Sequence, residues 1–134
     1  MELGYKTYEV RDFIRKTEAG ELDIKASVEI VKELAATAGF HTDHNILLDL
    51  RDTAIAGPVN LTGLLEIVME FVRYEYAFKN KIAVLIPNKP ERIMQAQYIA
   101  NAMQVKGLSC NYFTDFEAAL DWMSTVRAYP DNST

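Results

Sequence analysis

Two groups of polar side chains follow apolar segments of the chain, and together they could bind a polar or anionic ligand. Asp49, Arg51 and Asp52 come at the end of the apolar run that starts at Ile46. A second apolar run, at 82–86, is followed by Asn88, Lys89 and Arg92. If the two runs are neighbouring parallel strands, these groups meet at one edge of a sheet, where α/β proteins keep ligand sites. The alternative, which we prefer, is an ion-pair network that satisfies Asp49.

Thr62 is a candidate phospho-acceptor, because it falls within the first turn of a predicted helix that starts near Gly57-Pro58. The free N–H groups and the dipole at a helix N-terminus stabilise a phosphate there. The alternative is that Asn60 or Thr62 only caps the helix. We prefer the capping role.

Other residue types with reactive or metal-binding chemistry are isolated. His41, Asp43 and His44 lie close together, but they precede a predicted strand, and no further ligand completes a zinc site. Cys110 has no neighbouring basic group that would make it reactive. The sequence therefore predicts no bound metal, no cofactor and no enzymatic activity.

The second predicted helix carries more apolar residues than one core-facing stripe needs. Met69 and Tyr74, beside Arg73, lie off the stripe and could line a dimer face or a cavity. A helix that is more deeply buried than average would explain the same excess. The predicted stripe itself consists of Leu61, Leu64, Leu65, Val68, Val72 and Tyr76.

Composition limits the classes of function. The 134 residues suit one domain, predicted to span 1–134 with a polar tail at about 129–134. A net charge of −5 argues against a nucleic-acid partner. The apolar stretches are shorter than the ~20 residues of a membrane span. The single cysteine and the absence of an apolar leader predict a cytoplasmic location.

Hydrophobic periodicity predicts the elements that position these residues, in the order β-β-α-β-α-β-α-β-α. The strands are predicted at 5–10, 13–19, 45–50, 81–86 and 108–113, and helices follow the last four. Alternating strands and helices favour an α/β fold with a mixed, mostly parallel sheet of about five strands. The first strand is predicted to form a hairpin near Arg11-Asp12 and to add antiparallel. Leu48 and Val84 are predicted to be fully buried.

Three segments resemble the STAS-like superfamily, and its SpoIIAA-like group in particular. They are Glu18–Asp23, Ile46–Arg51 and Phe113–Met123. The resemblance implies a single-domain STAS/SpoIIAA-like fold over nearly the whole chain. In phospho-regulated members a serine is phosphorylated within an Asp-Ser-Ser-Gly-Leu motif. The matching segment here, Asn60–Leu64, keeps the Gly-Leu pair and offers Thr62, but it lacks the aspartate and the first serine.

Two functions agree with these observations. The first is a non-enzymatic regulatory or interaction module that contacts another protein or a second copy of itself. The alternative is a small-molecule or lipid-binding domain with an apolar cavity under its second and third helices, since the resemblance includes folds that hold apolar ligands.

Overall fold

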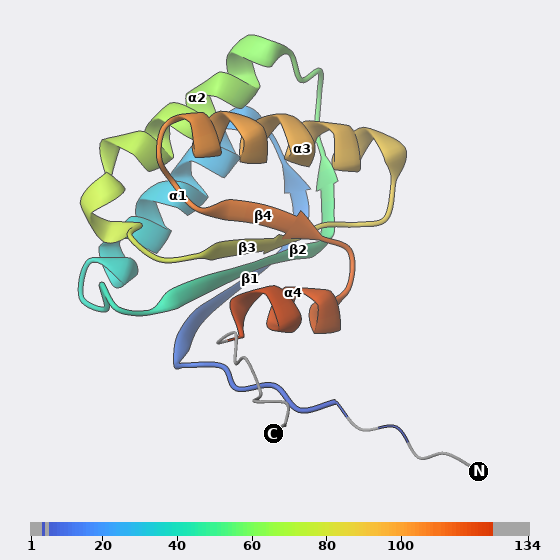
Figure 1. Cartoon of the computed structure of the whole chain (residues 1–134). Coiled ribbons are helices and arrows are strands. Elements are labelled where there is room, and N and C mark those ends of the chain that lie inside the picture. The colour runs from blue at the N-terminus through green and yellow to red at the C-terminus, as the bar shows by residue number, and fades with distance from the viewer. Residues whose placement is uncertain (1–3, 5, 125–134) are drawn as a thin grey trace.

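The computed structural model describes residue 4 and residues 6–124. Strands and helices alternate along these residues (Figure 1). The strands are β1 (Phe13–Leu22), β2 (Asn45–Ile55), β3 (Ile82–Leu85) and β4 (Cys110–Phe113). The helices are α1 (Ile24–Ala38), α2 (Leu61–Arg73), a short 3₁₀ turn (Glu75–Ala77), α3 (Pro90–Val105) and α4 (Phe116–Met123).

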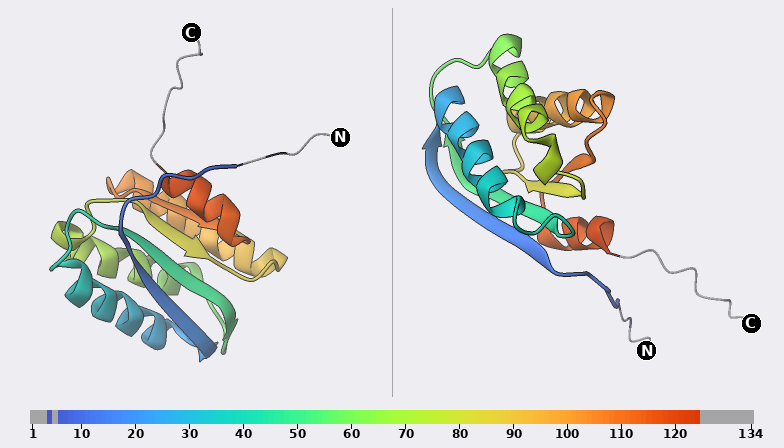
Figure 2. Two further views of the ribbon diagram at one scale, coloured as in Figure 1. Left: turned by 90° about the horizontal axis from the view of Figure 1, so that it is seen from below. Right: turned by 90° about the vertical axis from the view of Figure 1, so that its left-hand side faces the viewer.

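The sheet has the order β1-β2-β3-β4, and every neighbouring pair is parallel. Each crossover connection therefore leads to the adjacent strand, always on the same side of the preceding one. Because such crossovers are right-handed, the helices that make them lie on one face of the sheet. Figure 2 shows α1, α2 and α3 on that face and α4 on the opposite face.

The predicted N-terminal hairpin is wrong. Residues 6–12 form no strand, so the described sheet has four strands and not about five, and β1 runs parallel to β2. The segment is held by α4, since Lys6 and Tyr8 donate hydrogen bonds of 2.9 and 2.7 Å to the Glu117 carboxylate. Residue 5 of the predicted hairpin and the predicted polar tail at 129–134 lie outside the described residues.

β1 and β2 are longer than their neighbours and curve toward the helical layer (Figure 2). β2 was predicted to end at Leu50, but it continues because β1 pairs with it as far as Leu22 opposite Ile55. Gly20 pairs with Thr53 in this extension and has a φ of 92°, which suits glycine. Asp49, Arg51 and Asp52 therefore lie inside β2 and not beyond its end.

The core lies on both faces of the sheet. On the helical face, α1, α2 and α3 pack over Ile46 and Ile82, and on the other face α4 packs over Leu47 and Leu85. Leu48 is buried as predicted, but Val84 is only half-buried although it lies in a central strand. Packing on the helical face is therefore incomplete over Val84.

The predicted inner stripe of α2 is partly wrong. Leu64 and Val68 face the core, together with Phe71, whereas Leu61 and Leu65 are exposed. The inner face is set by the contact with α1, where Gly63 packs on Ile24. A Cβ at position 63 would lie 2.9 Å from the Ile24 Cγ1 atom, so a larger residue there would require the Ile24 side chain to move. Tyr76 is also exposed, because α2 ends at Arg73 and a 3₁₀ turn follows.

Candidate functional site

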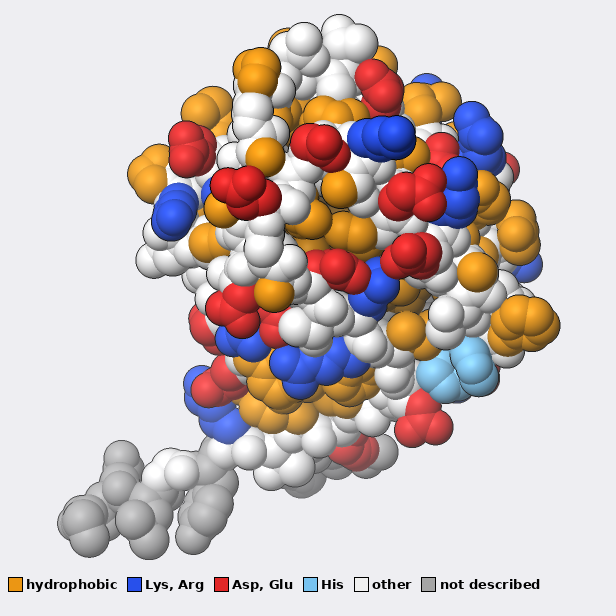
Figure 3. All heavy atoms as spheres, turned by 180° about the vertical axis from the view of Figure 1, so that it is seen from behind, with side chains coloured by type: hydrophobic (Ala, Val, Ile, Leu, Met, Phe, Trp, Pro, Cys, Tyr) orange, Lys and Arg blue, Asp and Glu red, His pale blue; other side chains and the backbone are white. Residues whose placement is uncertain are grey.

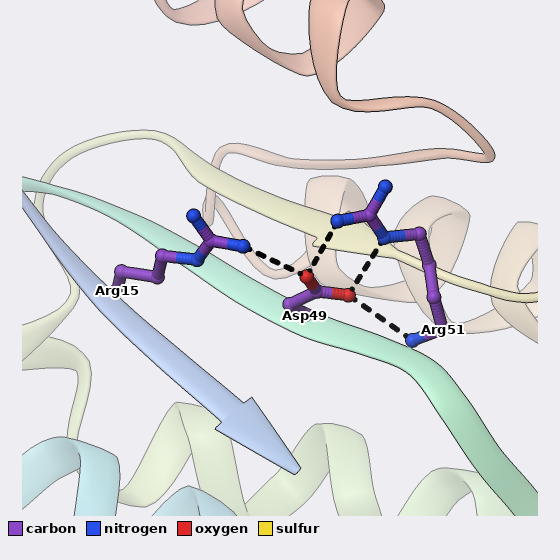
Figure 4. A network of polar contacts seen from close by, with 3 residues as sticks. All are labelled: Arg15, Asp49 and Arg51. Atoms are coloured by element: carbon purple, nitrogen blue, oxygen red, sulfur yellow. Dashed lines mark hydrogen bonds and ion pairs between the residues drawn. The ribbon is translucent and has the colours of Figure 1, made fainter. Parts of the chain in front are cut away.

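Two arginines hold the Asp49 carboxylate on the face of the sheet that α4 covers (Figure 4). Arg51 donates from Nε to Oδ1 at 3.0 Å and from Nη2 to Oδ2 at 2.8 Å. Arg15 of β1 donates from Nη2 to Oδ2 at 3.2 Å, and its guanidinium also lies over the Phe116 ring of α4. This arrangement satisfies a carboxylate that is only 5% exposed.

The charge of Asp49 is stable over a wide range of pH. The hydrogen bonds from Arg51 lower the pKa of Asp49 from 3.8 to about 2, although burial by itself would raise it. Asp49 in turn raises the pKa of Arg51. The cluster of two cations and one anion is an ion-pair network, and ligand binding at its exposed edge stays a prediction.

The other residues predicted at this rim do not join the cluster. Among the described residues, no hydrogen bond or ion pair connects Asp49 to Asn88, Lys89 or Asp52, which are exposed. Arg92 bonds instead to Thr53. β2 extends past Leu50, so the two strands do not end together, and a ligand rim formed by all six residues stays a prediction. Arg15 was missed because it comes 34 residues before Asp49 and only strand pairing brings them together.

A cavity of about 110 Å³ lies on the opposite face of the sheet, between the strands and the three helices α1, α2 and α3. Its walls are mainly apolar. Val84 lines the cavity and is therefore not fully covered. Residues of all four strands and of three helices contribute, among them Val31, Leu48, Leu64, Phe71, Val84 and Ile99. This cavity matches the predicted one in its position under α2 and α3.

The polar side chains in the cavity wall come mostly from the starts of two helices. Asp23 and Ser27 belong to the beginning of α1, and Arg92 and Gln95 to the beginning of α3. Arg92 is 6% exposed and donates to the Thr53 carbonyl and hydroxyl oxygens at 2.8 and 2.9 Å. Burial lowers the pKa of Arg92 from 12.5, but an arginine side chain stays protonated in proteins. The cavity thus has an apolar wall and one buried cation.

The cysteine and the histidines have ordinary surroundings. Burial raises the pKa of Cys110, which also lines the cavity, to about 12, so its thiol is protonated at neutral pH. His44 Nδ1 lies 2.9 Å from the Asp43 carboxylate, and the two histidine side chains lie together on the surface (Figure 3). Within residue 4 and residues 6–124, no group of His, Cys, Asp or Glu side chains could hold a metal ion.

The start of α2 is capped by Asn60. The Asn60 side-chain oxygen accepts a 2.8 Å hydrogen bond from the backbone N–H of Gly63, and it is the N-cap residue of the helix. Thr62 is exposed in the first turn. Asn60 therefore supplies the cap, and the phosphorylation of Thr62 stays a prediction.

The outer face of α2 differs from the predicted one. Met69 and Arg73 are exposed, but Tyr74 is half-buried and packs against the core. Leu61 and Leu65, which were predicted to face inward, lie one turn apart in line with Met69. We refer to Leu61, Leu65 and Met69 as the α2 stripe. In the described part of the chain, no helix is long and apolar enough to cross a membrane.

No protein-family model matches the chain, and no curated protein matches its sequence. A solved structure is similar: an uncharacterised protein of the DUF3478 family from Shewanella loihica PV-4, described as having a SpoIIAA-like fold. The two share 15% sequence identity with a TM-score of 0.54, over 91% of this chain and 99% of that one. The likeness confirms the predicted SpoIIAA-like α/β fold and, at this identity, concerns the fold alone.

Proposed function

Since the chain has a SpoIIAA-like fold with an apolar cavity between its sheet and its helices, we propose that the protein is a non-enzymatic module that binds a small apolar molecule. The observation that carries this proposal is the cavity of about 110 Å³ between the sheet and α1, α2 and α3. Apolar cavities of roughly this size, about 150 Å³, stay dry and bind molecules such as benzene. We place an alkyl or aryl group of the ligand against Val84, where the strand is incompletely covered.

The titratable groups in the cavity wall favour binding over catalysis. They are Asp23, Arg92, Cys110 and Tyr112. The Asp23 carboxylate accepts from the Ala26 N–H as a helix cap. Within the described structure no two of these four side chains hydrogen-bond to each other, so no nucleophile is paired with a base.

Filling the cavity tests this function. Ala96 of α3 lines the cavity and is half-buried, so in the Ala96→Phe variant the ring should occupy the space of the ligand. We expect octan-1-ol to bind the wild type and to bind Ala96→Phe at least about tenfold more weakly, since apolar burial contributes roughly 0.8 kcal/mol per CH₂. Isothermal titration calorimetry measures both affinities.

The matched control is Gln97→Phe, which adds the same ring at the next residue of α3, an exposed position outside the cavity wall. Gln97→Phe should bind octan-1-ol like the wild type. The proposed function is contradicted if Ala96→Phe binds octan-1-ol as tightly as the wild type. It is also contradicted if the wild type does not bind octan-1-ol at millimolar concentration. Native mass spectrometry of gently purified protein should also show a bound small molecule.

A second candidate function is protein contact through the α2 stripe. Leu61, Leu65 and Met69 are 63%, 41% and 43% exposed and recur every four residues, which places them on one face of the helix. A monomer rarely exposes a contiguous apolar patch without a use for it. A two-fold homodimer would cover the stripe with the same stripe of a second copy.

Light scattering tests the homodimer. We expect a dimeric mass at micromolar concentration, and the Leu65→Glu variant should raise the dissociation constant by about 30-fold or more, since a central contact is worth about 2 kcal/mol. Val105→Glu, at an exposed apolar residue of α3, is the control and should leave the mass unchanged. A monomeric wild type at about 100 µM would reject a homodimer with a micromolar dissociation constant, which corresponds to about −8 kcal/mol.

A further inference from the structure

Arg92 is a buried cation that forms no ion pair with the described residues. Its side chain is held by two hydrogen bonds, and both acceptors are uncharged oxygens of Thr53. Among the described residues no carboxylate lies within ion-pair distance of the Arg92 guanidinium. A buried charge is costly unless it is paired, and a guanidinium has five N–H groups, of which Thr53 uses two. Arg92, which lines the cavity, therefore has N–H groups that Thr53 does not use and a charge that no ion pair among the described residues compensates.

The helices on this face add to the positive potential near Arg92. α1, α2 and α3 all start at the carboxyl end of the preceding strand, and each contributes residues from its first two turns to the cavity wall. The N-terminus of a helix carries a partial positive charge. The other charged residue in the wall, Asp23, is exposed and its carboxylate caps α1, so it partly offsets the dipole of that helix alone.

We propose that the ligand of the cavity is an amphipathic anion, whose alkyl or aryl part lies against Val84 and whose carboxylate or phosphate group binds Arg92. This inference rests on the proposed function, because it assumes that the cavity binds an apolar group. Ser27 and Gln95, from α1 and α3, supply further polar side chains in the same wall. The arrangement favours a single-chain acid over a neutral hydrocarbon of the same length, because only the acid compensates the charge of Arg92.

Three ligands with one tail length test the proposal. Octanoate, octyl phosphate and octan-1-ol are titrated into the full chain at neutral pH by calorimetry. We expect at least one of the two anions to bind the wild type at least about tenfold more tightly than the alcohol does. A difference of this size corresponds to one hydrogen bond to a charged group. The comparison of octanoate with octyl phosphate identifies which anionic group Arg92 recognises.

Variants locate the effect. In Arg92→Gln the ratio of the affinity for the anion to the affinity for octan-1-ol should fall to about one, and Arg92→Lys should keep part of the preference. The matched control Lys89→Gln removes an exposed cation that precedes α3 and should keep all of it. If Arg92→Gln does not fold, the wild-type comparison of anion and alcohol still decides the proposal.

The outcomes separate the two proposals. This inference is overturned if octan-1-ol binds the wild type as tightly as both anions do. It is also overturned if the Arg92→Gln variant keeps the preference for an anion. Either result leaves the proposed apolar binding in place. Failure of all three ligands to bind would overturn both.

Discussion

Replacing Phe78 by alanine should lower the free energy of unfolding by about 4 kcal/mol, because a buried ring is lost and a cavity is left. Phe78 follows the 3₁₀ turn and is 2% exposed within the core that joins α1, α2 and α3 to the sheet. Its ring meets the Phe71 ring edge-on, with 5.0 Å between the centroids. Such aromatic pairs add about 1 kcal/mol beyond the buried area.

Urea denaturation of the Phe78→Ala variant measures this loss. Tyr76→Ala serves as the control. Tyr76 lies in the 3₁₀ turn, two residues before Phe78, and is 59% exposed. The control should change the unfolding free energy by less than about 0.5 kcal/mol. A loss below about 1 kcal/mol at Phe78 would show that the helical layer packs on the sheet in another way.

Asp49→Asn should cost about 2 kcal/mol of stability at pH 7. The pKa of Asp49 is lowered from 3.8 to about 2 by Arg51 and Arg15, and a difference of this size is equivalent to about 2 kcal/mol. Because the folded-state pKa lies below the unfolded value, the contribution is complete above about pH 4. It is lost as the pH falls from about 4 to about 2, where the carboxylate takes up a proton.

The difference in stability between the wild type and Asp49→Asn should therefore shrink toward zero across this window of pH. Denaturant titrations at several pH values between 2 and 7 measure it. Asp52→Asn is the control, since Asp52 is exposed in the same strand and is not joined to either arginine by a hydrogen bond in the described residues. A difference that stays constant with pH would mean that the carboxylate charge contributes no stability.

Local signals predicted much of the fold. The apolar run at 46–50 marks β2 because a strand covered on both faces has no polar alternation, and the run at 82–86 marks β3 for the same reason. Asp23 caps α1 and Pro90 starts α3, as short-range capping rules require. These features depend on residues a few positions apart, so they can be read without the tertiary structure.

The candidate sites were predicted less well, because they depend on which strand lies beside which. Arg15 reaches Asp49 only through the pairing of β1 with β2, and this pairing also extends β2 beyond its predicted end at Leu50. The predicted N-terminal hairpin was wrong because that segment bonds to Glu117 of α4 and packs through Val10 on the core under α4, and it does not pair with a strand. Long-range contacts of this kind leave no periodic signal in the chain.

The amino-acid sequence by itself determined the alternation of strands and helices and the right-handed parallel sheet that follows from it, since both arise from local periodicity and chirality. Only the tertiary structure decided the face of α2 that packs on α1, through the contact of Gly63 with Ile24, and the incomplete cover over Val84. The cavity lies between the three helices and a sheet whose two long strands curve toward them, and the volume left there depends on the packing of all the elements together.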